Sequence, residues 1–279
     1  MVLFGPAGSD DEMSAKKIKS IQIPEYLKNK GLDAFEYPFT RGVNLSKETA
    51  TLLRDEFQKN NIALSVHAPY FINLGQVDPV KVQNSFSYLL ASVERARDLG
   101  ADRVVFHPAS LTSQTREVAF SNTYENTKML VDLVKENGYD DIFLCPETMG
   151  KHGQIGTYEE IAKLCEIDPI IIPTLDFGHI NSFTTGGLNS VEKFEEILDL
   201  FVNKLGRKEI HIHFSPIEYG AKGELKHLTI ETDPGFGPDF KLMIDALRKF
   251  DANFRIISES RGMQVSDSII IKKYYEKGF

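Results

Sequence analysis

Cysteine is scarce in this sequence, with only Cys145 and Cys165 among 279 residues. Folds that depend on disulfides need more thiols than this, so the two residues favour a reduced protein of the cytoplasm. No apolar run reaches the roughly 18 residues that a membrane-spanning helix needs. Residues 1–5 lack the basic region and cleavage site of a secretory signal. We therefore expect a cytoplasmic protein that does not enter a membrane.

Positively charged residues are also fewer than negatively charged ones. The chain carries 32 Lys and Arg against 40 Asp and Glu, which gives a net charge of −8. This balance argues against broad, non-specific binding to nucleic acid. It still allows a local basic rim, for which Lys151, Lys222, Lys226 and Arg261 are candidates, or a site whose positive charge comes from bound metal. Hydrophobic residues make up 42% and charged residues 26%, so a sizeable core is expected and disorder is not.

Short apolar segments alternate with segments of helical spacing along the whole chain. The segments predicted as strands are 2–5, 33–39, 62–70, 103–110, 141–148, 170–175, 209–215 and 254–259. The segments predicted as helices are 16–30, 46–60, 80–99, 117–137, a helix opened by a capping box at Thr157 and Glu160, and then 190–205, 239–250 and 266–277.

The alternation predicts an α/β fold, because apolar parallel strands must be covered by amphipathic helices. Eight strand–helix units in about 250 residues are typical of a closed (β/α)8 TIM barrel. An open, doubly wound sheet is the main competitor, but no glycine-rich nucleotide-binding fingerprint follows the first strand. There is no linker, fixed repeat or low-complexity segment. We therefore predict a single TIM-barrel domain over residues 1–279.

A strand ending in Leu175 is followed at once by Asp176 and, three residues later, by His179. Gly178 between them permits a sharp turn. A carboxylate and an imidazole offered together at a strand end can hold one divalent cation or bridge two.

The same arrangement recurs at other predicted strand ends. Six of the seven histidines lie at or just after such ends, and none is predicted inside a helix. In a barrel, the C-terminal ends of all strands converge on one mouth, so these side chains are expected to meet. The histidines are His67, His107, His179, His211, His213 and His227, and the carboxylates in equivalent places are Glu147, Asp176 and Glu259.

Some of these positions also have ordinary interpretations. Taken singly, His67 could be a loop histidine bonded to backbone, and Glu259 could pair with Arg261 on the surface. His211 and His213 share one face of their strand, because side chains alternate with a period of two. The strand end favours His213 as the ligand, and His211 remains a second candidate.

Imidazoles and carboxylates without thiolates suit zinc, manganese or iron rather than calcium. The candidate donors outnumber the three or four protein ligands of one catalytic zinc, so two or three ions are expected. Adjacent divalent ions are suited to hydrolysis of phosphate esters.

Several of these segments carry a resemblance to a known family. The motifs HAPY at 67–70 with INL at 72–74, FHPAS at 106–110, PET at 146–148, DFGH at 176–179, and the isolated Glu259 resemble those of the endonuclease IV family. That family comprises apurinic/apyrimidinic endonucleases of the xylose isomerase-like TIM barrel superfamily. The resemblance spans nearly the whole chain. The first two motifs are fairly specific to the nucleases, whereas the later ones are shared with sugar isomerases.

The resemblance implies a zinc-dependent phosphodiesterase that acts on double-stranded DNA and cleaves 5′ to abasic sites, with Glu147 and Glu259 as catalytic, bridging carboxylates. It implies two or three Zn²⁺ ions, with Mn²⁺ or Fe²⁺ as alternatives at some sites. Tyr70, Arg41 and Gln154 match positions that contact DNA. We expect a monomer. The implied ligands are His67, His107 and Glu147 for one ion, Glu147, Asp176, Glu259 and His211 or His213 for a second, and His179 and His227 for a third.

One position departs from the family pattern. The family has a metal-binding Asp two residues before the last histidine, where this chain has Leu225. A third ion therefore depends on whether the neighbouring Glu224 can take that place.

A competing hypothesis is a sugar isomerase or epimerase that uses a single divalent ion. The carboxylates Glu147 and Glu259 would then also move protons next to a carbonyl group, with Asp176 and His213 completing the ligand set. The remaining histidines would contact the substrate. A metal-binding barrel without catalysis is a third alternative.

Overall fold

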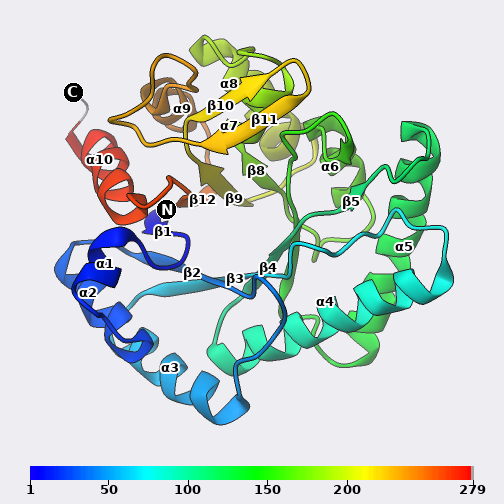
Figure 1. Cartoon of the computed structure of the whole chain (residues 1–279), viewed down its shortest axis with the longest axis horizontal. Helices are drawn as coiled ribbons and strands as arrows, with labels where there is room; N and C mark the ends of the chain where they lie inside the picture. The colour runs from blue at the N-terminus through cyan, green and yellow to red at the C-terminus, as the bar shows by residue number, and fades with distance from the viewer. Residues whose placement is uncertain (278–279) are drawn as a thin grey trace.

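The alternation of strands and helices appears in the computed structural model, which describes residues 1–277. Helices surround a ring of strands, with the first and last strands side by side (Figure 1). The strands of the ring are β1 (Val2–Pro6), β2 (Ala34–Pro38), β3 (Ala63–His67), β4 (Arg103–Phe106), β6 (Phe143–Pro146), β8 (Thr174–Asp176), β9 (Glu209–Phe214) and β12 (Asn253–Ser258).

The ring is built from two four-stranded parallel sheets, ordered β1-β12-β9-β8 and β2-β3-β4-β6. An isolated parallel bridge between Ala7 and Glu36 joins β1 to β2. Two more, Leu144 to Ile171 and Glu147 to Thr174, join β6 to the segment that contains β8. The two sheets thus meet at both seams, as the predicted barrel requires, and all strand C-termini face the same end.

The helices cover the outer face of this ring (Figure 1). They are α1 (Asp11–Ala15), α2 (Ile23–Asn29), α3 (Lys47–Lys59), α4 (Pro79–Leu99), α5 (Arg116–Glu136), α6 (Tyr158–Cys165), α7 (Phe177–Phe183), α8 (Val191–Asp199), α9 (Phe240–Leu247) and α10 (Gln264–Lys277), with a 3₁₀ turn at Ser20–Gln22 and a π turn at Leu200–Lys204. The predicted capping box is present, since Thr157 Oγ1 accepts the Glu160 N–H and Glu160 Oε2 accepts the Thr157 N–H.

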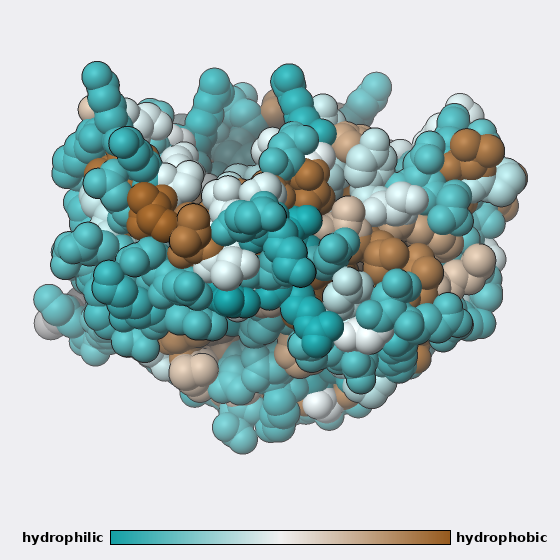
Figure 2. Space-filling view, turned by 90° about the horizontal axis from the view of Figure 1, so that it is seen from below, coloured by the Kyte–Doolittle hydropathy of each residue, from teal (hydrophilic) through white to brown (hydrophobic). Residues whose placement is uncertain are grey.

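Aromatic and aliphatic side chains fill the space between strands and helices. Phe4 on β1, Phe35 on β2 and Phe106 on β4 are buried, and each contributes roughly 1.5–3 kcal/mol by leaving water. The face of the molecule seen in Figure 2 is mostly hydrophilic, with scattered hydrophobic patches. Within the described residues, no helix has the length and apolar character needed to cross a membrane.

Charged side chains form a buried network at the N-terminal end of the ring. Arg255 on β12 donates to Asp102 Oδ1 at 2.7 Å and to the Leu64 carbonyl at 2.8 Å. Arg103 donates to the same Asp102 carboxylate at 3.1 and 3.0 Å. Two buried guanidinium groups thus share one carboxylate at the end of the barrel opposite the strand C-termini.

Several local expectations were wrong. The helix predicted over 16–30 is broken into shorter turns before α2. Two antiparallel pairings were not predicted, the hairpin of β10 (Ile217–Gly220) with β11 (Gly223–His227) and the pairing of β5 (Ala109–Ser110) with β7 (Gln154–Ile155), which lie far apart in the sequence. They are short and carry no long alternating pattern, which is why periodicity missed them.

The turn expected at Gly178 is also absent, because α7 begins directly after Asp176 and contains both Gly178 and His179. His179 is therefore a helical histidine, contrary to the prediction. Asp176 is the N-cap of this helix, and its Oδ1 accepts the His179 N–H at 2.7 Å. Gly178 serves a different purpose from the predicted one: an added Cβ would lie 2.4 Å from the Ser215 carbonyl oxygen, so glycine lets α7 approach the end of β9.

Candidate metal centre

A cavity of about 310 Å³ lies at the C-terminal end of the barrel. Its lining includes His67, His107, His179, His227 and Glu259. A larger cavity, about 560 Å³, lies beside Pro238 and contains none of the predicted metal ligands. Of these two cavities, the smaller one is therefore the candidate metal site.

Glu147 occupies the centre of the donor cluster. It follows β6 and its side chain is buried. Its Oε2 lies 3.2 Å from His67 Nε2 and 3.3 Å from His107 Nε2. Its Oε1 lies 3.1 Å from His213 Nδ1 and 3.3 Å from His179 Nδ1. One carboxylate thus faces imidazoles from four different strand ends, which is the placement expected of a bridging ligand.

The first group of donors is His67, His107 and Glu147, whose ligand atoms all lie within 4.8 Å of one another. These residues end or follow β3, β4 and β6, which are consecutive in one sheet. Parallel pairing therefore brings them together without any special loop. The imidazole rings of His67 and His107 meet edge to face, with centroids 5.1 Å apart.

The second group is Glu147, Asp176, His213 and Glu259, again within 4.8 Å. The Asp176 side chain is buried, and its Oδ2 has no hydrogen-bond partner within the described residues. His213 Nδ1 lies 3.4 Å from Glu259 Oε1. Three carboxylates packed this closely repel one another unless positive charge is present. The unpartnered oxygen and the donor types therefore fit a divalent cation.

The third group is His179, Glu224 and His227. Glu224 Oε2 lies 3.5 Å from His179 Nε2, and the Ser215 hydroxyl lies 2.8 Å from His227 Nδ1. Leu225 is 62% exposed. The β10–β11 hairpin thus places a carboxylate one residue earlier than the family pattern does, and the group still contains two histidines and one acid.

The electrostatics of the cluster fit a site that binds cations. Burial alone lowers the pKa of His67, but the Glu147 carboxylate more than offsets this and raises that pKa to about 9. Burial also lowers the pKa of His179, and Asp176 and Glu147 raise it to about 10. The pKa of Asp176 is raised to about 7, first by burial and then by Glu259 and Glu147. Protons on imidazoles balance the carboxylates here, and bound divalent ions fit the same role.

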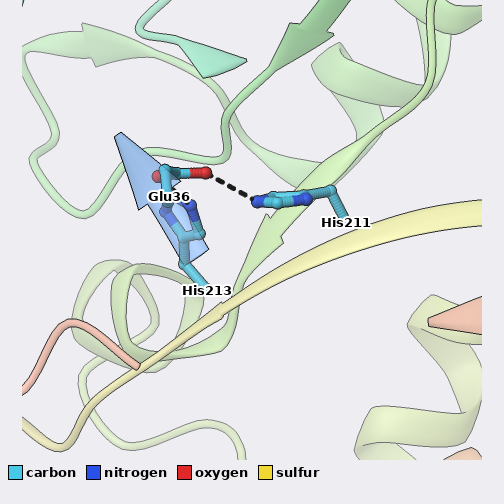
Figure 3. Close-up of side chains that lie close together, drawn as sticks. All are labelled: Glu36, His211 and His213. Atoms are coloured by element: carbon cyan, nitrogen blue, oxygen red, sulfur yellow. Dashed lines mark hydrogen bonds and ion pairs between the residues drawn. The ribbon is translucent and has the colours of Figure 1, made fainter. Parts of the chain in front are cut away.

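The two histidines of β9 occupy different environments. His213 Nδ1 belongs to the second group, whereas His211 Nε2 lies 3.0 Å from Glu36 Oε2 (Figure 3). Burial lowers the pKa of His211 to about 3, so its ring is neutral. The geometry therefore favours His213 as the ligand. Sequence reasoning missed Glu36, for which the one available signal was an acidic residue in an otherwise apolar strand.

The predicted DNA-contacting residues lie at or near the rim. Tyr70 is 58% exposed and lines the cavity, and Gln154 lines it as well. Arg41 is exposed in the loop after β2, next to Thr40, which lines the cavity. Lys151 also lines it and lies 3.7 Å from Glu224 Oε2. Positive charge is therefore present at the mouth, although part of it is already paired.

Comparison with known proteins places this geometry in a family. Residues 24–277 match the xylose isomerase-like TIM barrel family. The chain belongs to that family. The resemblance drawn from the histidine and carboxylate motifs is confirmed at this level.

Two relatives illustrate the range of similarity. An uncharacterized protein of Methanocaldococcus jannaschii is 31% identical over 283 residues, covering 99% of this chain and 98% of that protein. A probable endonuclease 4 of Oceanobacillus iheyensis is 31% identical over 182 residues, covering 62% of this chain and 57% of that protein. The aligned part thus spans a little over half the length of this second relative.

Solved structures share the fold across more than one activity. Endonuclease IV from Thermus thermophilus superposes with a TM-score of 0.70 at 18% identity, covering 99% of each chain. A D-tagatose 3-epimerase-like protein superposes with a TM-score of 0.68 at 20% identity, covering 88% of this chain and 89% of that chain. The fold alone therefore does not distinguish these activities, and the choice between them depends on the site.

Proposed function

We propose that the protein is a metal-dependent phosphodiesterase that cleaves double-stranded DNA 5′ to abasic sites. The observation that carries this proposal is the sharing of Glu147 between two donor groups, with a third group adjacent to it through His179. Donors for more than one divalent ion, a few ångströms apart, are suited to phosphate chemistry. The similarity to a probable endonuclease 4 supports the same assignment.

The residues would divide the work by their position. His67 and His107 with Glu147 would hold one zinc, and Asp176, His213 and Glu259 would hold a second with the same Glu147. His179, Glu224 and His227 would hold a third. Divalent ions bound there would polarise phosphoryl oxygens, lower the pKa of a nearby water and stabilise the leaving oxygen. Mn²⁺ or Fe²⁺ are alternative occupants for a donor set of this type.

The two catalytic carboxylates differ in access to the cavity. Glu147 is 1% exposed and is surrounded by imidazoles, so it holds the cluster together. Glu259 is 19% exposed and lines the cavity, where it can accept a proton from a water that attacks the substrate. Glu259→Gln should therefore remove turnover while the fold is retained.

The rim would select the damaged substrate. Tyr70 offers an exposed aromatic face beside the metal cavity, and Gln154 and Arg41 offer polar contacts nearby. An abasic site has no base to unstack, so distorting it out of the helix costs less than flipping an intact nucleotide. Selectivity can arise from this difference without any residue that reads sequence.

The second candidate function is a sugar epimerase with one ion. The group of Glu147, Asp176, His213 and Glu259 favours it, because among the donor groups of the described residues this set places three carboxylates at a single cation site, of which Glu147 and Glu259 would move protons. The fold it shares with an epimerase-like protein is compatible with this alternative.

The test is incubation of zinc-loaded protein with a duplex that carries one abasic analogue, together with a screen of ketoses. We expect a single cut 5′ to the analogue, no cut in the matched intact duplex, and no turnover by Glu259→Gln. Epimerised sugar with an uncut duplex, and about one ion per chain, would favour the second candidate and contradict the first.

A further inference from the structure

Glu36 lies in the middle of β2, is 1% exposed and borders the same cavity as the metal donors. We propose that Glu36 is a positioning residue that holds His213 as its Nε2–H tautomer and so presents Nδ1 to the second group of metal donors. This inference rests on the metal site proposed above, and its tests do not depend on which reaction that site catalyses.

Two hydrogen bonds and one close imidazole contact converge on the Glu36 carboxylate. Ser65 Oγ donates to Oε2 at 2.8 Å, and His211 Nε2 lies 3.0 Å from the same oxygen. His213 Nε2 lies 2.9 Å from the other oxygen, Oε1 (Figure 3). His213 Nε2 and Glu36 Oε1 are both buried, neither makes a hydrogen bond within the described residues, and each is the ion-pair contact of the other at 2.9 Å. Each is therefore the partner that the other needs.

The opposite nitrogen of the His213 ring faces the cluster. Its Nδ1 lies 3.1 Å from Glu147 Oε1 and 3.4 Å from Glu259 Oε1. A neutral imidazole binds a metal through the nitrogen that carries no proton, so a proton fixed on Nε2 leaves Nδ1 free. A carboxylate behind a metal-binding histidine fixes both the tautomer and the direction of the ring.

The same three residues, Glu36, His211 and His213, have ligand atoms close enough to hold an ion themselves. The geometry points instead to hydrogen bonding. The His211 and Ser65 contacts at 3.0 and 2.8 Å are ordinary hydrogen-bond distances, and both converge on Oε2. An ion held by Glu36, His211 and His213 would have to bind His213 through Nε2. The same ring could then not also serve the second group as a neutral ligand through Nδ1.

The first test measures Zn²⁺ affinity of Glu36→Gln by competition with a chelator of known affinity. A glutamine side chain carries no charge, and its NH₂ group would face the N–H and O–H donors that now point at Glu36. We therefore expect the Zn²⁺ affinity of the second donor group to fall ~10–100-fold. The matched control is Ser65→Ala, which removes the hydrogen bond to Oε2 of the same carboxylate, the oxygen that does not face His213. We expect it to bind zinc as the unaltered protein does. Unchanged affinity in Glu36→Gln, or an equal loss in Ser65→Ala, would overturn the inference.

The second test needs no variant, and so it remains informative if Glu36→Gln does not fold. Nitrogen-15 spectra of the zinc-loaded protein report which ring nitrogens carry protons. We expect protons on Nε2 of both His213 and His211, and none on His213 Nδ1. A proton on His213 Nδ1, or an unprotonated His211 Nε2, would overturn the inference, the latter in favour of an ion held by Glu36. An uncut abasic duplex would instead contradict the proposed function and leave this result intact.

Discussion

Glu224 Oε2 lies 3.5 Å from His179 Nε2, although the two residues come from a hairpin and a helix that are 45 positions apart in the chain. The other oxygen of Glu224 lies 3.9 Å from His227 Nε2. Gly223 precedes this carboxylate with a φ of +93°, and an added Cβ there would lie 2.0 Å from the Gly150 carbonyl oxygen. Close approach of the hairpin to residue 150 thus places Glu224, rather than Leu225, in the third donor group.

This geometry predicts that Glu224→Gln lowers the bound zinc by about one ion per chain, because the third group keeps its two histidines but loses its only carboxylate. Metal content after dialysis, measured by elemental analysis, checks the expectation. The control is Glu218→Gln, which lies on the same hairpin and pairs with Lys226 instead of the donors. Full zinc content in Glu224→Gln would show that this carboxylate is not a ligand.

Removal of metal should destabilise the folded protein. Without cations, the buried carboxylates Glu147 and Asp176 and the neighbouring Glu259 depend on imidazole protons for charge balance, and a ligand bound only to the folded state stabilises it. We expect a strong zinc chelator to lower Tm and added Zn²⁺ to restore it. Thermal unfolding followed by circular dichroism measures both. Identical Tm values with and without chelator would contradict a tightly bound metal cluster.

Gly178→Ala should destabilise the protein and disturb the donors on either side of it. The new Cβ would lie 2.4 Å from the Ser215 carbonyl oxygen and 2.9 Å from Ile217 Cδ1. Forcing backbone apart at such a contact costs about 1–3 kcal/mol. Urea unfolding measures the loss, with Gly153→Ala as the control, since a Cβ at Gly153 meets nothing within 4 Å. Equal stability of the two variants would remove the packing explanation for Gly178.

The fold was predictable because its signal is repeated. Each strand–helix unit contributes one apolar run for the strand and one amphipathic pattern for the helix. The site was predictable for the same reason, since parallel strands deliver His67, His107 and Glu147 to one place whatever their loops do. Glu36 was not predicted because its partners, His211 and His213 on β9, lie far from it in the sequence. A single acidic residue in a strand is also a weak signal. Glu224 was only an alternative at the level of sequence, because its direction depends on a hairpin that periodicity does not reveal.

Asp102 joins two buried arginines, Arg103 and Arg255, at the N-terminal end of the barrel. Burial raises the pKa of Asp102, but Arg255 and Arg103 more than offset this and hold it well below its usual range. A carboxyl group whose folded pKa is depressed stabilises the fold at all pH values above its unfolded pKa of about 3.9 and loses that contribution as the pH falls toward the folded pKa. The stabilisation by Asp102 is therefore complete at neutral pH and fades in acid.

Asp102→Asn should lower the free energy of unfolding at pH 7 by about 1–3 kcal/mol, because it leaves two guanidinium groups without their counter-charge. The Asp102 side chain is 44% exposed, so solvent screens part of the interaction and favours the lower end of this range. The difference between the variant and the unaltered protein should shrink below about pH 4, where Asp102 begins to bind a proton. Urea unfolding at several pH values measures this, with the fully exposed Asp251→Asn as a control expected to change little. A difference that stays constant from neutral to acid pH would mean that Asp102 acts through packing or hydrogen bonding rather than through its charge.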